Sequence, residues 1–197
     1  MLNMKINLFF LLSILMGLVV ISSNFLVQFP VNYYNLNNIL TYGAFSYPIT
    51  FLITDLANRA YGQHQARKIV YIGFIIGIAL TLLVSTNYSD LISIRIAIGS
   101  GTAFFIAQNI DVKIFHRLRS NKKWFVAPFI SSLIGSMIDT ILFFSIAFYN
   151  TGIPWINLAI GDFFVKFMIA LIMLIPFRLL LRKIRSYSHK DISYKII

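Results

Sequence analysis

Long apolar runs, separated by short connections, constrain this chain more than any other feature. Six of them approach the ~20 residues that a helix needs to cross ~30 Å of hydrocarbon. Their approximate limits are Ile6–Phe29, Ile39–Asn58, Ile69–Thr86, Ile94–Phe115, Phe125–Tyr149 and Trp155–Leu181. The chain is 58% hydrophobic and 12% charged, whereas soluble domains carry about 25% charged residues. We therefore predict an all-α integral membrane protein with six transmembrane helices.

The basic residues indicate how these helices are oriented. Lys and Arg precede the first run, lie between the second and third and between the fourth and fifth, and follow the sixth. The alternate connections, at 30–38, 87–93 and 150–154, contain neither. Because cytoplasmic loops carry the positive excess, we predict that both termini are cytoplasmic. Residues 1–181 are expected to form one domain, and 182–197 a basic cytoplasmic tail that contacts anionic lipid.

Composition also argues against several classes of function. The net charge of +11 does not indicate nucleic-acid binding, because the basic residues lie between apolar runs and not on one soluble face. There is no cysteine, and the three histidines fall in expected loops without the spacing of metal ligands. No phosphate-binding GxxxxGK[ST], HExxH or GxSxG motif occurs. We therefore expect neither an enzyme nor a bound metal or cofactor.

Charged residues inside the fifth and sixth runs need an explanation, because each costs roughly 2.5–3.5 kcal/mol to insert. Asp139 shares a helical face with Ser132 and Ser136. Asp162 and Lys166 are four residues apart, which allows an ion pair on one helix. For Asp139 two interpretations remain open: close helix packing with the acid paired to a neighbour, or the wall of a substrate cavity. Asp162 and Lys166 either neutralise one another or serve a function in the middle of the membrane.

Amide side chains occur in two other runs. Gln108 lies on one stripe of the fourth run with Asp111, and the first run carries Asn24 and Gln28. In lipid such amides either join helices or face a polar cavity, and the sequence favours neither.

The stretch 41–69 begins apolar and becomes charged as it approaches a glycine turn. Asp55, Arg59 and Arg67 lie there, and Asp111 of the fourth run is expected at the same inner boundary. Charge costs little at that depth. We expect these four residues to act on the inner side, with Asp55 either as an inner gate or as a partner of Arg59 or Arg67.

Five segments, in order over nearly the whole chain, resemble the queuosine precursor transporters, a vitamin uptake family. They are ISSNFLVQFPV (Ile21–Val31), TYGAFSYPITFLITDLANRAYG followed by ARK (Thr41–Lys68), RIAIGSGTAFFIAQNIDVKIFHRLR (Arg95–Arg119), WFVAPFISSLIGSMIDTILFFSIAFY (Trp124–Tyr149) and GDFFVKFMIALIMLIP (Gly161–Pro176). The resemblance implies a six-helix carrier of the bacterial inner membrane. Its substrates would be 7-deazaguanine bases with cyano or aminomethyl substituents, or queuine, for tRNA modification.

The implied substrate has a guanine-type edge, with a ring N–H beside an exocyclic amine. A carboxylate accepts both at once, and the neighbouring carbonyl needs a donor. Asp139 or Asp162 is the expected acceptor, and the expected donor is Gln108, Asn24 or Lys166. Gln28 is added as a candidate because it follows Asn24 by one helical turn.

Two other functions remain open. The first is a substrate-binding subunit that docks on a separate ATP-driven module, for which Gly17, Gly73 and Gly77 are candidate docking positions. The second is a membrane scaffold that transports nothing. The expected partners are a purine-like small molecule and the lipid bilayer, and the sequence leaves a homo-oligomer open.

Overall fold

The computed structural model describes the backbone of residues 2–33, 40–84 and 91–193, and the side chains of 8–33, 40–79, 91–92 and 94–182. Within these ranges the chain is helical, and its one strand-like feature is a bridge between Pro30 and Thr41. The helices are α1 (Leu2–Leu26), α2 (Gly43–Ser46), α3 (Ile49–Tyr61), α4 (Gln63–Val84), α5 (Leu91–Leu118), α6 (Val126–Phe148) and α7 (Trp155–Ser193). The all-α prediction is confirmed. The predicted limits at Ile39 and Thr86 lie outside the described residues.

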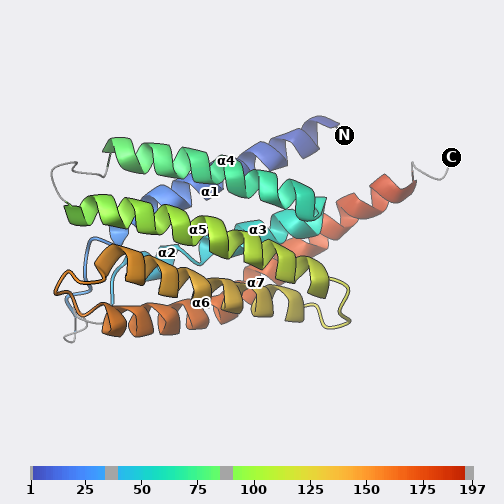
Figure 1. Cartoon of the computed structure of the whole chain (residues 1–197). Coiled ribbons are helices and arrows are strands. Elements are labelled where there is room, and N and C mark those ends of the chain that lie inside the picture. Colours follow the sequence, from blue (N-terminus) through green and yellow to red (C-terminus); the bar gives the residue numbers. More distant parts are fainter. Residues whose placement is uncertain (1, 34–39, 85–90, 194–197) are drawn as a thin grey trace.

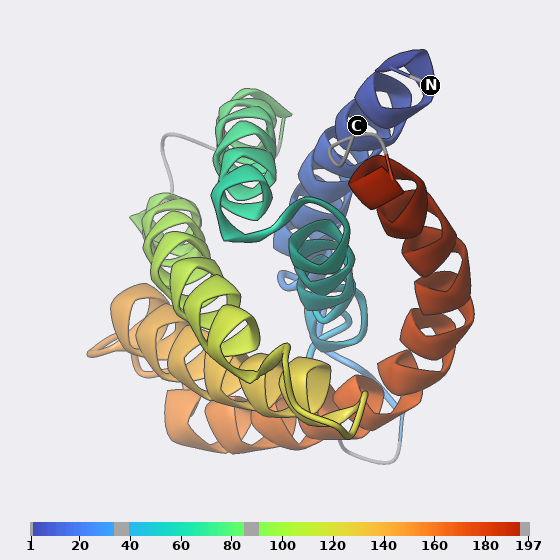
Figure 2. The same cartoon turned by 90° about the vertical axis from the view of Figure 1, so that its right-hand side faces the viewer.

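The helices form a bundle with α3 at its centre. Figure 1 shows the longer helices running along the bundle axis, and Figure 2, seen from one end, shows the others arranged around α3. Helix α3 contacts α1, α4, α5, α6 and α7. The start of α1, the α3–α4 corner, the α5–α6 connection and the end of α7 all lie at one end (Figure 1). Three of the predicted basic segments therefore meet there, together with the start of the chain.

The second predicted run is not one helix, because it is divided into α2 and α3 at Tyr47-Pro48. Proline has no backbone N–H and cannot continue the helical hydrogen-bond pattern. The Thr50 hydroxyl donates to the Tyr47 carbonyl at 2.7 Å, which satisfies an acceptor at the break. The first half lies tightly against α1, since a Cβ at Gly43 would be 3.0 Å from the Ser23 carbonyl oxygen.

Helices α1 and α5 differ from their predicted limits by three or four residues, and two others, α4 and α7, differ by more. Helix α4 begins at Gln63, so a single residue, Gly62 with φ +82°, separates it from α3. Helix α7 continues past Leu181 to Ser193, so the first part of the predicted tail is a helical extension. Each change lengthens a predicted helix, and neither changes the order of the helices.

Small residues allow α1 and α4 to pack closely. Gly73 and Gly77 are one turn apart on α4 and face Met16 and Val20 of α1. A Cβ at Gly77 would lie 2.6 Å from Cγ1 of Val20. This spacing of small residues is common where helices meet in membranes.

The distribution of polarity is the reverse of that in a soluble protein. Asp111 and Gln108 are fully buried, whereas Phe164 and Ile160 are 64% and 66% exposed. Among the residues whose side chains are described, three helical segments are long and apolar enough to cross a membrane: Leu8–Leu26, Val126–Phe148 and Trp155–Arg182. Large apolar side chains on the outside and polar ones inside fit a surface that faces lipid.

Candidate functional site

A buried ion cluster joins α6 to α7. The Lys166 ammonium lies 2.6 Å from Oδ2 of Asp162 on the same helix and 2.8 Å from Oδ2 of Asp139 on α6. It also contacts the Thr140 hydroxyl at 3.2 Å, and that hydroxyl donates to Asp162 at 2.8 Å. The predicted pair on one helix is therefore present, and Asp139 makes it a triad. The cluster is buried, since none of the three charged residues exceeds 4% exposure.

Tyr47 enters this cluster from the break between α2 and α3. Its hydroxyl donates to Oδ1 of Asp139 at 2.5 Å. The Lys166 ammonium lies 4.7 Å from the centre of the tyrosine ring, in the range of a cation–π contact. The break between α2 and α3 thus places the Tyr47 side chain against both Asp139 and Lys166.

The cluster lines a small, partly open cavity of about 30 Å³. Helix α1 contributes Asn24, α5 contributes Ser100 and α6 contributes Phe143. A buried water needs ~10–15 Å³ of such space, so the cavity has room for about two waters. A bicyclic base therefore requires the surrounding helices to move apart. Two carboxylates and one ammonium give the lining a net charge of −1 when all three are ionised.

The three predicted amide residues lie in different surroundings. Asn24 lines the cavity and accepts a hydrogen bond from the Ser100 hydroxyl. Gln28 is exposed, and its amide donates to the Asn24 backbone carbonyl at 3.3 Å. Gln108 lies outside the cavity lining, between α3 and α5, where it contacts Thr54 at 2.5 Å and Thr50 at 2.8 Å. Only Asn24 of these three therefore lies beside the charged cluster.

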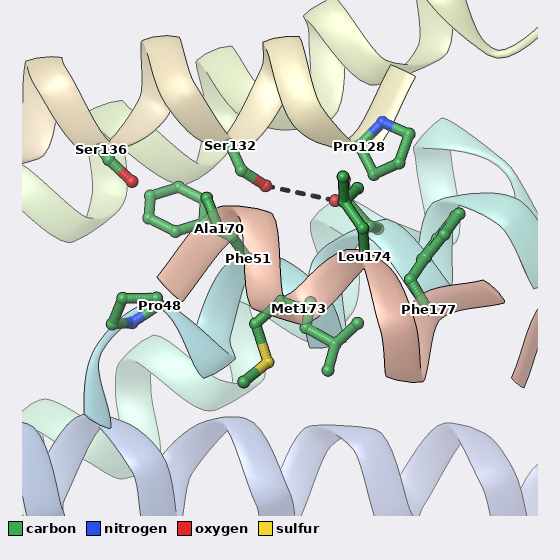
Figure 3. A pocket seen from close by; sticks show the side chains of 11 residues that line it. Pro48, Phe51, Pro128, Ser132, Ser136, Ala170, Met173, Leu174 and Phe177 are labelled. Atoms are coloured by element: carbon green, nitrogen blue, oxygen red, sulfur yellow. Dashed lines mark hydrogen bonds between the residues drawn. The ribbon is translucent and has the colours of Figure 1, made fainter. Parts of the chain in front are cut away.

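A second buried cluster contains Asp55 and Asp111. The hydroxyls of Ser131 and Ser132 donate to the two carboxylate oxygens of Asp55 at 3.2 and 3.3 Å. Figure 3 shows the Ser132 contact beside a pocket between α3, α6 and α7. Asp111 is fully buried, and neither of its carboxylate oxygens has a hydrogen-bond partner among the described residues.

The expected pairing of Asp55 with Arg59 or Arg67 is not observed. Arg59 donates to the Arg119 backbone carbonyl at 2.9 Å, which ties the α3–α4 corner to the α5–α6 connection. The serines are the described partners of Asp55. Both arginines nevertheless lie at the basic end of the bundle, where the sequence places them.

Sequence reasoning missed Tyr47, Thr140 and Ser100. Each lies next to a feature that gives a usable signal. Tyr47 immediately precedes the proline that breaks its helix, and Thr140 follows Asp139 directly. Ser100 lies two turns before Gln108, on the polar stripe of α5.

Comparison with known proteins identifies the family of this chain. A family described as "Putative vitamin uptake transporter" matches residues 41–181. The chain belongs to this family. The match includes every charged residue of both buried clusters, and the family is one of transporters and not of enzymes, as predicted. No solved structure matches the chain significantly.

Three curated relatives are similar to this transporter over most of their length. The queuosine precursor transporter of Escherichia coli K12 is 34% identical over 85% of this chain and 83% of its own. A probable queuosine precursor transporter of Haemophilus influenzae is also 34% identical, over 80% and 79%. One of Bacillus subtilis is 29% identical over 68% of each chain.

Proposed function

We propose that this transporter imports queuosine precursors, which are 7-deazaguanine bases, across the bacterial inner membrane. The observation that supports this most directly is the buried Asp139–Lys166–Asp162 cluster beside a small cavity, in a bundle whose outer surface is apolar. The names of the three relatives add the substrate class.

The proposed topology has six passes and cytoplasmic termini. Helices α1, α4, α5, α6 and α7 each supply one pass, and the broken pair α2–α3 supplies another. At ~1.5 Å per residue, the 13 residues of α3 extend about 20 Å, so α2 and the Tyr47-Pro48 break are needed to complete a pass. The grouping of basic connections at one end of the bundle supports this orientation.

The cluster has the chemistry that a guanine-type edge requires. Both oxygens of Asp139 are engaged, by Tyr47 and Lys166. Asp162 uses Oδ2 for its contacts to Thr140 and Lys166, which leaves Oδ1 without a partner among the described residues. Asp162 is therefore the first acceptor for the N–H groups of the base, with charge assistance.

Binding the base changes the role of Lys166. A ring N–H and an amine that approach Asp162 compete with the ammonium for this carboxylate. Lys166 can then turn to the base carbonyl while it keeps Asp139. The rings of Tyr47 and Phe143 offer flat apolar surfaces to the purine-like ring. Alternating exposure of this cavity to the two sides of the membrane completes transport.

Substitution of Asp139 tests this proposal. Asp139→Asn removes a charge that both Tyr47 and Lys166 contact, so uptake should fall to background while the protein still inserts. Asn109→Ala is the matched control, because Asn109 lies on the outer side of α5 against Tyr71. The assay uses a bacterium unable to make the precursors, supplied with each base in turn, and measures queuosine in tRNA. Normal uptake by Asp139→Asn would refute the assignment.

The alternative function is a substrate-binding subunit, and its candidate docking positions lie between α1 and α4. Gly17, Gly73 and Gly77 are used inside the bundle, where they allow α1 and α4 to pack. Uptake into liposomes that contain only this chain separates the two functions, because a subunit that needs an ATP-driven module would transport nothing there. A scaffold would likewise show no flux, and its Asp139 variant would change assembly instead.

A further inference from the structure

The Asp55–Asp111 cluster is separate from the proposed base-binding cavity, yet it is as deeply buried. Asp55 is 2% exposed and Asp111 0%. Hydrogen bonds between α3 and α5 bracket the two acids, because Thr54 contacts Gln108 on one side and Asn58 donates to the Val112 carbonyl at 2.9 Å on the other. Asp55 lies between Thr54 and Asn58 on α3, and Asp111 lies between Gln108 and Val112 on α5, so these two bonds hold the two acids on facing stretches of neighbouring helices.

No positive charge neutralises this pair among the described residues. Lys166 on α7 is held by Asp139 and Asp162. Arg178 on α7 lies over the Trp124 ring, at 5.0 Å from its centre. The other described basic side chains of α4, α5 and α7 form no ion pair with either acid, and most are exposed: His64, Arg67, Lys68, Arg95, Lys113, His116, Arg117 and Arg182. Arg59, on α3 itself, donates to the Arg119 carbonyl.

The serine face of α6 completes the surroundings of the pair. This helix has no ionisable residue facing the acids besides the distant Asp139. A Cβ at Gly135 would lie 3.3 Å from Cβ of Asp111, so the glycine lets α6 approach closely. The Ser136 hydroxyl is 1% exposed and has no described partner. It points into the pocket that Asp55 and Ser132 also line (Figure 3).

The two carboxyls have different environments. Each oxygen of Asp55 accepts a serine hydroxyl, an arrangement that stabilises an anion. Neither oxygen of Asp111 forms a hydrogen bond with a described residue, although the Ser131 hydroxyl that binds Asp55 also acts electrostatically on Asp111. Two adjacent buried anions without a cation would be strongly unfavourable, and a proton on Asp111 removes one charge and supplies a donor. Among the described residues, the Asp111 carboxyl and the Ser136 hydroxyl have no hydrogen-bond partner, and no cation neutralises the two acids. All three observations are explained by a proton bound at this site.

We propose that Asp55 and Asp111 form a binding site for a transported proton, separate from the base-binding cluster, with Asp111 carrying the proton and Asp55 as its charged neighbour. The inference rests on the proposed transport function. In each cycle an O–H bond forms on Asp111 when the site is open to the outside and breaks when it opens to the cytoplasm. The base itself undergoes no covalent change. A neutral base then crosses with one positive charge.

Flux measurements in liposomes containing only this chain provide the first test. The probe is radiolabelled 7-cyano-7-deazaguanine, a neutral base, and the membrane potential is held at zero. With one proton per base, the wild type should accumulate it about tenfold per unit of inward pH gradient, because equal free energies correspond to equal concentration ratios. Asp111→Asn should retain exchange of labelled for unlabelled base but lose this accumulation. Asp139→Asn, the comparison variant, should lose both.

The outcomes distinguish this inference from the proposed function. Wild-type exchange without any response to the pH gradient would overturn the proton site and leave base transport standing. Accumulation driven by a sodium gradient instead would also overturn it. Absence of flux for every base would refute the transport proposal itself.

Infrared spectroscopy of the purified protein tests the proton without any substrate. At neutral pH we expect the carbonyl band of a protonated carboxyl, lost in Asp111→Asn and retained in Asp162→Asn. Absence of the band in the wild type, or its persistence in both Asp55→Asn and Asp111→Asn, would overturn the proposal. This measurement needs only folded protein, which a single sharp melting transition in detergent establishes for each variant.

Discussion

Replacing Lys166 by methionine tests whether the cluster on α6 and α7 is held together by charge. At an effective dielectric constant of about 20, each contact of 2.6 and 2.8 Å contributes an attraction of about 6 kcal/mol before desolvation. Much of this gain is offset by several kcal/mol of desolvation for each ion. Methionine keeps the length of the side chain but leaves Asp139 and Asp162 without their cation.

The expected loss of stability is about 3–5 kcal/mol, the usual cost of removing one partner from a buried ion pair. For a chain of this size, 1 kcal/mol shifts Tm by about 2–4 °C, so Lys166→Met should melt roughly 6–20 °C lower. The measurement is thermal unfolding of the purified protein in one detergent, followed by intrinsic tryptophan fluorescence.

A triple variant without the three charges separates the effect of charge on stability from the effect of packing. Lys166→Met combined with Asp139→Asn and Asp162→Asn removes all three charges and keeps the shapes of the side chains. It should recover part of the lost stability, because no uncompensated charge is left buried, while the two unpaired amides keep a smaller cost. Uptake should stay abolished in both variants. The reasoning is refuted if Lys166→Met melts within 2 °C of the wild type, or if the triple variant is no more stable than the single one.

Three further substitutions test other parts of the bundle. Tyr47→Phe keeps the ring but removes a hydrogen bond to a charged group worth about 1.5–3 kcal/mol, so kcat/KM for uptake should fall roughly tenfold or more; an unchanged value would contradict a role for this hydroxyl. Gln108→Leu leaves Thr50 without its amide donor and should lower the free energy of unfolding by about 1–3 kcal/mol, measured by denaturation in mixed micelles. Gly77→Leu should destabilise the α1–α4 contact by about 1–3 kcal/mol through overpacking, seen as a lower Tm, and an unchanged Tm would show that α4 can shift.

The sequence predicted the helical class because this property depends on local composition. The i, i+4 pair of Asp162 and Lys166 was also predictable, since its geometry lies within one helix. The convergence of Asp139 on that pair required knowledge of how α6 packs on α7. The register between helices could not be predicted from the sequence. Gln108 was therefore predicted to line the cavity, whereas its amide forms hydrogen bonds with Thr50 and Thr54.

The break at Tyr47-Pro48 shows a different limit. Hydropathy alone joined 39–58 into one span, because Pro48 is surrounded by apolar residues. Proline within a membrane helix is tolerated where neighbouring groups satisfy the freed backbone, and here both the hydroxyl and the backbone N–H of Thr50 donate to the Tyr47 carbonyl beside the break. The combination of a mid-run proline with a tyrosine before it and a threonine two residues after it was the signal available in the sequence.

The two buried clusters are connected through the same pair of helices. Tyr47, at the break just before α3, contacts Asp139 on α6. Asp55, eight residues later on α3, contacts Ser131 of α6, which lies eight residues before Asp139. Tyr47 and Pro48 both have helical dihedral angles. Eight residues of helix rise about 12 Å, so the spacing between the two contacts is matched on both helices. A displacement of α3 along α6 therefore changes both clusters together: it separates Tyr47 from Asp139 and the serines from Asp55. The contact between α3 and α6 belongs to both the proposed proton site and the proposed base site. Movement of these two helices alone would therefore couple binding at one site to binding at the other.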